Sequence, residues 1–413
     1  MADRGATLPA DGKPDIAIAD DGARRRILVV LPHLAVGGAE SHLVQVLPRL
    51  DRRRFAVSVC ATHGPGRYDA DMRRAGIAVD APPRERNGLN AVPAKFLHVL
   101  RAIRRARPDL VHFFLPQAYI VGGLAAILLG IRPRIMSRRS LNAYQAGKPL
   151  AARFEHWLHK RMDRLVANSS AVAAELRAEG VPAARITTIV NGIDTARFAG
   201  AGRASARAAL GLADDEVALV SVANLIPYKG HADLVAALGA ARLPPRWRCL
   251  LVGRNTRNVG PALDAQAASL GLAGRVVRLG ERSDVPAILA AADIVVLASH
   301  EEGSPNSVAE AMASGCAVIA TRVGGSAELI ADGRTGLLVP ARDPAALAAA
   351  LTRLAGDAPL RARLGSAARE HIVRHHALGD CIAAYEALYE SLLPPPVAGY
   401  AGSSGQGGRD IDA

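Results

Sequence analysis

Short apolar runs alternate with helical patterns along most of this chain. The first run, Ile27–Leu31, is followed from about Ala39 by apolar residues that recur every three or four positions, which is the spacing of one helix face. Further runs of strand length occur at Ala56–Cys60, Leu110–Phe114, Arg134–Met136, Arg164–Ala167 and Ile186–Val190. Strands that alternate with helices in this way predict a parallel sheet with helices on both faces.

The same alternation restarts after an interval around Asp194–Asp215 that is rich in Gly, Ala and Arg. A second series of strands is predicted at Val217–Val222, Arg248–Val252, Val276–Leu279, Ile294–Ala298 and Ala317–Ala320. The sequence therefore predicts an α/β protein with two doubly wound, Rossmann-like domains that face a central cleft. In such domains ligands bind beyond the carboxyl ends of the strands.

These patterns divide the chain into six segments. The predicted divisions are a disordered tail at 1–23, a first domain at 24–195, a linker at 196–213, a second domain at 214–379, a helix at 380–393 that crosses back to the first domain, and a disordered tail at 394–413. The tails are polar or rich in Pro, Gly and Ser, and such segments bury too little apolar surface to fold.

The cysteines and apolar stretches disfavour several classes of protein. The four cysteines lie far apart and form no C-x-x-C pair, which disfavours disulfides and zinc fingers and indicates a reducing cytoplasm. No signal peptide is visible in residues 1–23. The longest apolar stretch, Ala118–Ile131, is shorter than the roughly 20 residues that span a bilayer, so it predicts a buried helix.

The net positive charge belongs to the first half of the chain. Residues 1–195 hold 30 Lys and Arg against 17 Asp and Glu and carry the whole net charge of +13, whereas the charges of residues 196–413 cancel. A one-sided basic surface favours an anionic partner, such as the lipid at the inner face of the plasma membrane. The alternative is an arginine-rich composition that only decorates solvated helices. Nucleic acid is disfavoured as a partner because no nucleic-acid motif occurs.

The segment Glu302–Glu310 follows a predicted strand and enters a predicted helix. Its sequence is Glu-Gly-Ser-Pro-Asn-Ser-Val-Ala-Glu, in which Ser304 suits the N-cap and Pro305 the first helical position, and Gly315 suits the helix end. A helix N-terminus offers N–H groups to phosphate or sugar oxygens, and carboxylates accept hydrogen bonds from hydroxyls. The segment therefore predicts a site for a ligand that is part sugar and part phosphate. The alternative is a structural helix cap.

Three glycine-containing turns after other predicted strands suit the same cleft. Lys229-Gly230, preceded by Asn224, places an ammonium where it would meet a phosphate. Gly37-Gly38 opens the first helix and permits a ligand to approach the backbone closely, and Gly253 follows a strand of the second domain. Each turn also has a purely structural interpretation, because glycine is common in turns.

No group of His, Cys, Asp or Glu has convincing metal-ligand spacing. Asp69-Ala-Asp71 resembles the D-x-D of metal-dependent sugar transferases, but it begins a helical pattern, where helix capping is the expected role. No nucleophile elbow or Walker sequence occurs, which disfavours serine hydrolases and P-loop nucleotidases. We therefore expect no metal and no other cofactor.

In this order, the motifs resemble those of family 4 glycosyltransferases, which are retaining enzymes with the GT-B fold. The resemblance extends from about Ile27 to Leu393. It rests on Gly-Gly-Ala-Glu at 37–40, Asn-Gly-Ile-Asp at 191–194, Lys-Gly at 229–230, Leu-Gly-Glu-Arg-Ser-Asp-Val-Pro at 279–286, the segment at 302–310 and Val-Gly-Gly-Ser-Ala-Glu-Leu-Ile at 323–330.

The resemblance implies that a hexose or N-acetylhexosamine is transferred from a UDP- or GDP-sugar. The acceptor would be a glycan or a lipid-linked molecule in cell-envelope or exopolysaccharide synthesis. Such an enzyme would work in the cytoplasm, and an anionic membrane would hold it at the inner face. The anomeric configuration would be retained, with the leaving phosphate guiding transfer on the same face of the sugar.

Carried over by position, the resemblance assigns most of the donor site to the second domain. Glu302 and Lys229 would be the catalytic pair, with Lys229 at the diphosphate and Glu302 near the donor sugar. Glu310 would bind the ribose hydroxyls, and the amides around Asn306 and Ser307 would bind sugar hydroxyls. The other expected donor contacts are Gly37, Gly38, Asn224, Ser304 and Gly253.

Two positions depart from the family pattern. Asn224 stands where many members have an Arg that contacts phosphate, so Lys229 would carry more of that role. Arg139 stands nearest a family His and would suit an anionic acceptor, and His112 is the second candidate on the acceptor side. Two other functions stay open: a nucleotide-sugar epimerase of the same architecture, and a non-catalytic sugar-nucleotide-binding protein at the membrane.

Overall fold

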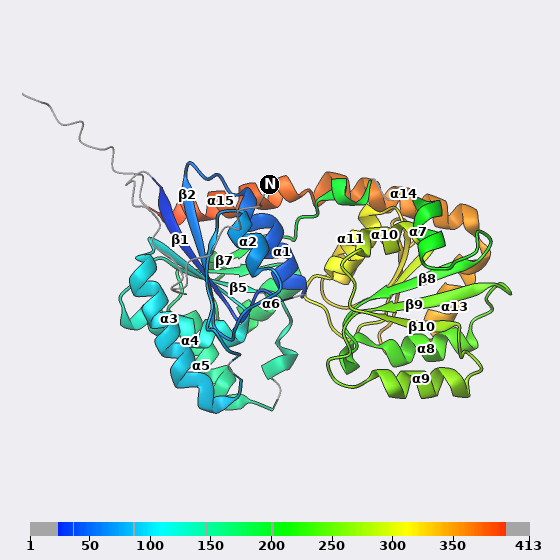
Figure 1. The fold of residues 1–413 in the computed structure, drawn as a ribbon, viewed down its shortest axis with the longest axis horizontal. Coiled ribbons are helices and arrows are strands. Elements are labelled where there is room, and N and C mark those ends of the chain that lie inside the picture. Colours follow the sequence, from blue (N-terminus) through cyan, green and yellow to red (C-terminus); the bar gives the residue numbers. More distant parts are fainter. Residues whose placement is uncertain (1–23, 36, 86, 146, 200–201, 394–413) are drawn as a thin grey trace, which may run out of the picture.

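Two parallel sheets, each with helices on both faces, form the two halves of an elongated molecule (Figure 1). The computed structural model describes residues 24–35, 37–85, 87–145, 147–199 and 202–393. The tails predicted to be disordered, 1–23 and 394–413, lie outside the described residues.

The first domain contains a seven-stranded sheet in the order β3-β2-β1-β4-β5-β6-β7, and all neighbouring strands are parallel. Alternate residues of its central strand β1 enter two different cores: Ile27 and Val29 face one, and Leu28 and Val30 face the other. Its strands are β1 (Arg25–Leu31), β2 (Phe55–Ala61), β3 (Ala78–Asp80), β4 (Leu110–Phe114), β5 (Arg134–Arg138), β6 (Arg164–Ala167) and β7 (Ile186–Thr188). Its helices are α1 (Gly38–Val46), α2 (Asp69–Arg74), α3 (Val92–Ala106), α4 (Pro116–Leu128), α5 (Pro149–His159) and α6 (Ser170–Ala178), with 3-10 turns η1 (Leu47–Arg49), η2 (Leu89–Ala91), η3 (Asn142–Gln145) and η4 (Ala183–Arg185).

The second domain contains a six-stranded parallel sheet in the order β10-β9-β8-β11-β12-β13. Its strands are β8 (Val217–Val222), β9 (Trp247–Val252), β10 (Val276–Gly280), β11 (Ile294–Leu297), β12 (Ala317–Thr321) and β13 (Leu337–Val339). Its helices are α7 (Arg203–Ala209), α8 (His231–Ala240), α9 (Gly260–Ser269), α10 (Val285–Ala291), α11 (Asn306–Ala313), α12 (Ser326–Leu329), α13 (Pro344–Gly356) and α14 (Ala358–His375), with 3-10 turns η5 (Thr195–Phe198) and η6 (Pro227–Lys229).

Every predicted strand is present, and two strands escaped prediction. The missed strands are β3 and β13, which lie at the edges of their sheets and have three residues each. A run of three residues is too short to show the periodicity by which strands are recognised. The predicted buried helix at Ala118–Ile131 corresponds to α4, and no helix among the described residues is long and apolar enough to cross a bilayer.

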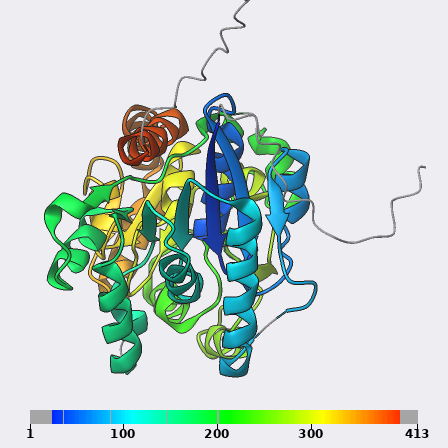
Figure 2. The same ribbon diagram turned by 90° about the vertical axis from the view of Figure 1, so that its left-hand side faces the viewer.

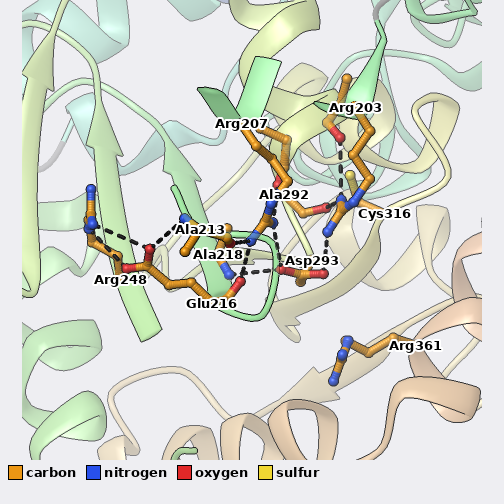
Figure 3. A network of polar contacts seen from close by, with 12 residues as sticks. Arg203, Arg207, Ala213, Glu216, Ala218, Arg248, Ala292, Asp293, Cys316 and Arg361 are labelled. Atoms are coloured by element: carbon orange, nitrogen blue, oxygen red, sulfur yellow. Dashed lines mark hydrogen bonds and ion pairs between the residues drawn. The ribbon is translucent and has the colours of Figure 1, made fainter. Parts of the chain in front are cut away.

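The described residues of the predicted linker at 196–213, which are 196–199 and 202–213, pack instead as part of the second domain. Figure 3 shows Arg203 and Arg207 reaching from α7 to the carboxylate of Asp293, with N–O distances of 2.6 and 3.3 Å. The Arg207 side chain is only 3% exposed and also donates to the carbonyls of Ala213 and Glu216. Arg203, which is exposed, and Arg207, which is buried, therefore both join α7 to the second domain.

The chain crosses between the domains twice, and the two crossings touch. The Ile193 N–H donates to the His376 carbonyl at 2.8 Å, and the Leu378 N–H donates to the Ile193 carbonyl at 3.2 Å. After the second crossing, α15 (Leu378–Leu392) packs on the first domain, where Tyr385 and Tyr389 are each 1% exposed. In Figure 1, α14 and α15 extend along the top of both domains.

Candidate functional site

A cleft of about 880 Å³ lies between the two domains. It is lined by residues that follow β1, β4, β5 and β6 in the first sheet and β8, β9, β10 and β11 in the second. Both sheets thus direct the carboxyl ends of their central strands toward one space, as expected for ligand sites in such sheets. All the predicted site residues line this cleft except His112.

The segment from Glu302 to α11 leads from β11 into the cleft. Its N-cap is Pro305, and the helix begins at Asn306, so the prediction of Ser304 as N-cap and Pro305 as the first helical residue is wrong by one position. Pro305 itself has extended backbone, with φ −80° and ψ 98°, so it takes the N-cap position and the helix begins one residue later. Ser304 still lines the cleft, and Gly315 ends the helix with φ +77°.

Close packing of glycine holds this segment in place. At Gly324 the backbone has φ +42°, and a Cβ there would lie 1.7 Å from the Glu302 carbonyl oxygen. Only glycine permits this approach. The turn after β12 therefore supports the backbone that presents Glu302 to the cleft.

Lys229 and Glu302 form an ion pair on the second-domain wall of the cleft. Lys229 Nζ lies 2.6 Å from Glu302 Oε1, and the same oxygen accepts from Ser299 Oγ at 2.6 Å. Glu302 is 8% exposed. Burial alone would lower the pKa of Lys229, but the Glu302 carboxylate and its neighbours outweigh that effect and raise it. Lys229 therefore stays cationic and keeps further N–H donors for an anion.

Glu310 lies in α11, about one turn below the helix start, and faces the same cleft. Burial raises the pKa of its carboxyl to about 7, although the positive charge of Arg197 acts in the opposite direction. Near neutral pH this carboxyl is thus divided between a form that can donate one hydrogen bond and a form that only accepts. Ligand hydroxyls would stabilise the accepting, ionised form.

Asn306 bridges the two walls of the cleft. Its Nδ2 donates to the Gly38 carbonyl at 2.7 Å, and its Oδ1 accepts from the Asn191 side chain. Gly38 begins α1, and a Cβ at Gly37 would meet the Glu40 carboxylate. Asn191 was recognised in the sequence only as part of the motif at 191–194, so its contact across the cleft is a finding of the tertiary structure.

Asn224 holds the turns after β8 and β9 together. Its Oδ1 accepts from the Arg254 N–H at 3.1 Å. Gly253, with φ +153°, lies so close to the Ala223 carbonyl that a Cβ would be 2.1 Å from the oxygen. Asn224 therefore supports the cleft wall through its side-chain oxygen. Its Nδ2 provides a neutral hydrogen-bond donor at the position where many family members have the cationic side chain of Arg.

Arg139 lines the cleft from the first domain. Arg138, the last residue of β5, is 1% exposed and binds Glu179, so the next side chain turns the other way. Arg139 Nη1 donates to Tyr385 Oη at 3.3 Å, while its Nε and Nη2 are buried without a partner among the described residues. This guanidinium can donate two parallel hydrogen bonds to an anionic group.

His112 is not an acceptor-side residue. It is 0% exposed within β4, and its ring nitrogens contact Tyr389 Oη at 3.0 Å and Ser137 Oγ at 2.8 Å. Burial, assisted by the charge of Arg139, lowers its pKa well below the usual value. The alternation of β4 directs this side chain under α15, away from the cleft, so its role is to join α15 to the sheet.

Some residues of the cleft were missed by sequence reasoning. They are Glu40, Arg67, Arg197, Glu281 and Arg282. Arg67 and Glu281 form an ion pair across the cleft at 3.6 Å. Three of the five, Glu40, Glu281 and Arg282, stand inside motifs recognised in the sequence, but nothing local indicates which side chain of a motif faces the ligand.

No group of three or more His, Cys, Asp or Glu among the described residues is arranged to hold a metal ion. Asp69 and Asp71 lie in the first turn of α2. Asp69 is 5% exposed, and Asp71 lines the cleft near its rim and binds Arg74. The pair therefore does not form a joint ligand set.

Glu328, from α12 of the second domain, caps a helix of the first. Its two carboxylate oxygens accept from the N–H groups of Ser170 and Ala171 at 2.8 and 2.9 Å, at the start of α6. Carboxylates are favoured at helix N-termini. Together with Asn306, Glu328 therefore stabilises the arrangement in which the domains meet.

We expect Glu328→Ala to favour separation of the domains. Loss of a carboxylate at a helix N-terminus costs about 1 kcal/mol, which corresponds to about a fivefold shift between closed and open forms. Small-angle scattering should show a larger radius of gyration. Glu370→Ala, which removes an exposed carboxylate of α14 paired with Arg374 in its own helix, is the matched control. An unchanged radius in both variants would contradict the role of Glu328.

Comparisons with known proteins agree in both domains. The family model described as Glycosyltransferase Family 4 matches residues 36–197, and the one described as Glycosyl transferases group 1 matches residues 216–357. A D-inositol 3-phosphate glycosyltransferase of Streptomyces scabiei is 31% identical, over 81% of this chain and 82% of its own. A GDP-mannose-dependent alpha-mannosyltransferase of Mycobacterium tuberculosis is 31% identical, over 74% of this chain and 80% of its own.

Solved structures resemble the whole fold. The structure of Anabaena HepE in complex with UDP and glucose superposes with a TM-score of 0.80 at 24% identity, covering 89% of this chain and 100% of that one. The predicted architecture of two Rossmann-like domains facing a cleft, the GT-B fold, is thereby confirmed.

Proposed function

Because this chain belongs to the family 4 glycosyltransferases and is a transferase of the GT-B type, we propose that it retains the anomeric configuration of a sugar that it takes from UDP or GDP. The proposed acceptor is a glycan or a lipid-linked molecule of cell-envelope or exopolysaccharide synthesis. The enzyme would act in the cytoplasm, at the inner face of the membrane.

The convergence of Lys229, Glu302 and the N-terminus of α11 on one wall of the cleft carries this proposal. An ammonium and a helix N-terminus suit a diphosphate. Glu310, about one turn into α11, suits the ribose hydroxyls. A nucleotide-diphosphate sugar carries both the diphosphate and the ribose hydroxyls that these groups would bind. The proteins similar to this chain include a GDP-mannose-dependent enzyme and a protein solved with UDP and glucose.

The chemical step would depend on electrostatic stabilisation. As the bond between the anomeric carbon and the diphosphate breaks, negative charge grows on the phosphate, and the Lys229 ammonium would stabilise it. Glu302 Oε1 already accepts hydrogen bonds from Lys229 and Ser299, which makes it a poor nucleophile. This favours transfer on the same face, in which the leaving phosphate takes the proton of the incoming hydroxyl.

We propose that Arg139 binds an anionic group of the acceptor. Its Nε and Nη2 are buried without partners among the described residues, and Arg139 is one of the first-domain residues that line the cleft. A planar pair of donors suits a phosphate or a carboxylate. One relative is named a D-inositol 3-phosphate glycosyltransferase, and this name is consistent with a phosphorylated acceptor.

A panel of UDP- and GDP-sugars in a thermal-shift assay tests the donor. A ligand present at 100 times its Kd stabilises the protein by about 2.7 kcal/mol. A sugar linked to the correct nucleotide, UDP or GDP, should therefore raise the melting temperature, and the same sugar linked to the other nucleotide should not. The stabilising sugar is then incubated with and without candidate acceptors. NMR of the new glycoside should show the anomeric configuration of the donor.

Two outcomes would overturn the proposal. If no nucleotide-diphosphate sugar stabilises the protein, the donor site is wrongly assigned. If the donor is isomerised in the absence of any acceptor, the reaction is that of an epimerase with the same fold.

A further inference from the structure

Exposed large apolar side chains gather on three helices of the first domain. They are Val92, Leu97, Leu124, Leu128, Leu150 and Trp157. The helices that carry them, α3, α4 and α5, pack side by side in one layer (Figure 1 and Figure 2). Leu150 and Leu128 are 80% and 66% exposed. Single exposed apolar residues are ordinary, but such a gathering marks an interaction surface.

The outer face of α5 shows the pattern most clearly. Leu150, Phe154 and Trp157 follow one another at helical spacing and so share one face, and Arg161 lies just beyond the end of the helix. The rings of Phe154 and Trp157 stack with centroids 5.4 Å apart, and the Arg161 guanidinium lies 3.6 Å from the Trp157 ring centroid. Aromatic rings beside basic residues are typical of surfaces that lie at a membrane interface.

Basic side chains surround these apolar residues, and acidic ones are absent from the surface of the three helices. Residues 86–162 contain fourteen Lys and Arg but only two acidic residues, Asp109 and Glu155. Glu155 is 2% exposed, and Asp109 binds Arg26 near the start of β4. The exposed basic residues are Arg101, Arg104, Arg105, Arg107, Arg132, Lys148, Arg153 and Lys160.

We propose that this outer face of α3, α4 and α5, the docking face, binds an anionic lipid bilayer. Its apolar side chains would enter the boundary between headgroups and acyl chains, while its Lys and Arg would meet lipid phosphates. A second copy of this chain is a poorer partner, because two such faces repel each other. Part of the net positive charge of the first domain would thus lie on the surface that contacts the lipid.

A short stretch of chain connects the cleft to the docking face. Arg139, Ser140 and Leu141 line the cleft, and the chain then passes through η3 to α5, which begins at Pro149. A bilayer on the docking face would present lipid-linked acceptors close to Arg139. The presentation of acceptors rests on the proposed transferase function, whereas the binding of the docking face to a bilayer does not.

Vesicle co-sedimentation of the full chain tests the docking face without any sugar. Binding should require phosphatidylglycerol mixed into phosphatidylcholine and should weaken as salt rises from about 0.1 M to about 0.5 M. The double substitution Arg153→Glu with Lys160→Glu should lower the partition coefficient about tenfold or more. Arg363→Glu with Arg369→Glu, which reverses two exposed charges on α14, is the matched control and should leave it unchanged.

Quenching by brominated lipids locates the contact. The chain has two tryptophans, of which Trp157 is 37% exposed and Trp247 is 7% exposed. Lipid bromines should quench the fluorescence of the wild type, and Trp157→Phe should abolish that quenching. The proposal fails if anionic vesicles do not bind, if both charge-reversal variants bind equally, or if light scattering shows a dimer that Leu150→Ser dissociates. Transfer to a water-soluble acceptor should persist in the docking variants, which separates this failure from that of the proposed function.

Discussion

Lys229→Met is expected to lower kcat by about 10² to 10³-fold with little change in the donor KM. Removal of one preorganised group that stabilises charge in the transition state has an effect of about that size. Lys229 Nζ lies 2.6 Å from Glu302 at the cleft wall and is held there in its charged form. Methionine preserves the length and most of the packing of the side chain and removes only the ammonium.

Stability must be separated from chemistry in this test, because Lys229→Met leaves the buried Glu302 carboxylate without its cation. Breaking a buried ion pair costs about 3–5 kcal/mol. The double variant Lys229→Met with Glu302→Gln removes both charges and should recover stability in denaturant titrations without recovering kcat. Arg322→Met, at an exposed ion pair with Asp332, serves as a control. A kcat within about threefold of wild type in the stable double variant would contradict the assignment.

Glu310→Ala is expected to raise the donor KM about 10- to 100-fold with a smaller effect on kcat. A carboxylate that accepts hydrogen bonds from ribose hydroxyls contributes about 1.5–3 kcal/mol per bond. Those bonds are made in the ground state as well as the transition state, so their loss appears mainly in KM. Isothermal calorimetry with the donor, and with the free nucleoside diphosphate, measures the same loss directly.

The pH profile gives this prediction a second readout. Burial raises the pKa of the Glu310 carboxyl to about 7, and ribose hydroxyls bind its ionised form better. Protons must therefore leave on binding below that pH, and the wild-type donor KM should fall as pH rises from about 6 to about 8. In Glu310→Gln the same profile should be flat across that range, and in the control Glu370→Gln it should follow the wild type. A titration that persists in Glu310→Gln would assign the ionisation to another group.

The second-domain side of the cleft was predictable to a large extent because its features are local. Lys229-Gly230 and Glu302–Glu310 each combine a strand end, a turn and a helix start within a few residues, and the structure places all of them at the cleft. The errors are local as well. The helix α11 begins one residue later than predicted because the backbone of Pro305 is extended, and the three-residue strands β3 and β13 gave no periodic signal.

The first-domain side was predicted less well because burial decided it. His112 lies in a predicted strand and Arg139 follows one, so the sequence offered both as candidates. Only the packing of α15 shows that one is covered and the other lines the cleft. Tyr389 from α15 covers His112, whereas Tyr385 from the same helix contacts one end of Arg139 and leaves two of its N–H groups without a partner among the described residues. The prediction of a linker at 196–213 failed for the same reason, since Arg207 of α7 is buried and binds Asp293.

The sequence by itself determined the two sheets, the family and most residues on the second-domain wall of the cleft, because hydrophobic periodicity and turn chemistry operate over a few neighbouring positions. The tertiary structure alone decided which distant residues meet. Asn306 joins Gly38 and Asn191, Glu328 caps α6, and the exposed faces of α3, α4 and α5 combine into one basic, apolar surface. These contacts join segments of the chain far apart in sequence, and no local pattern records them.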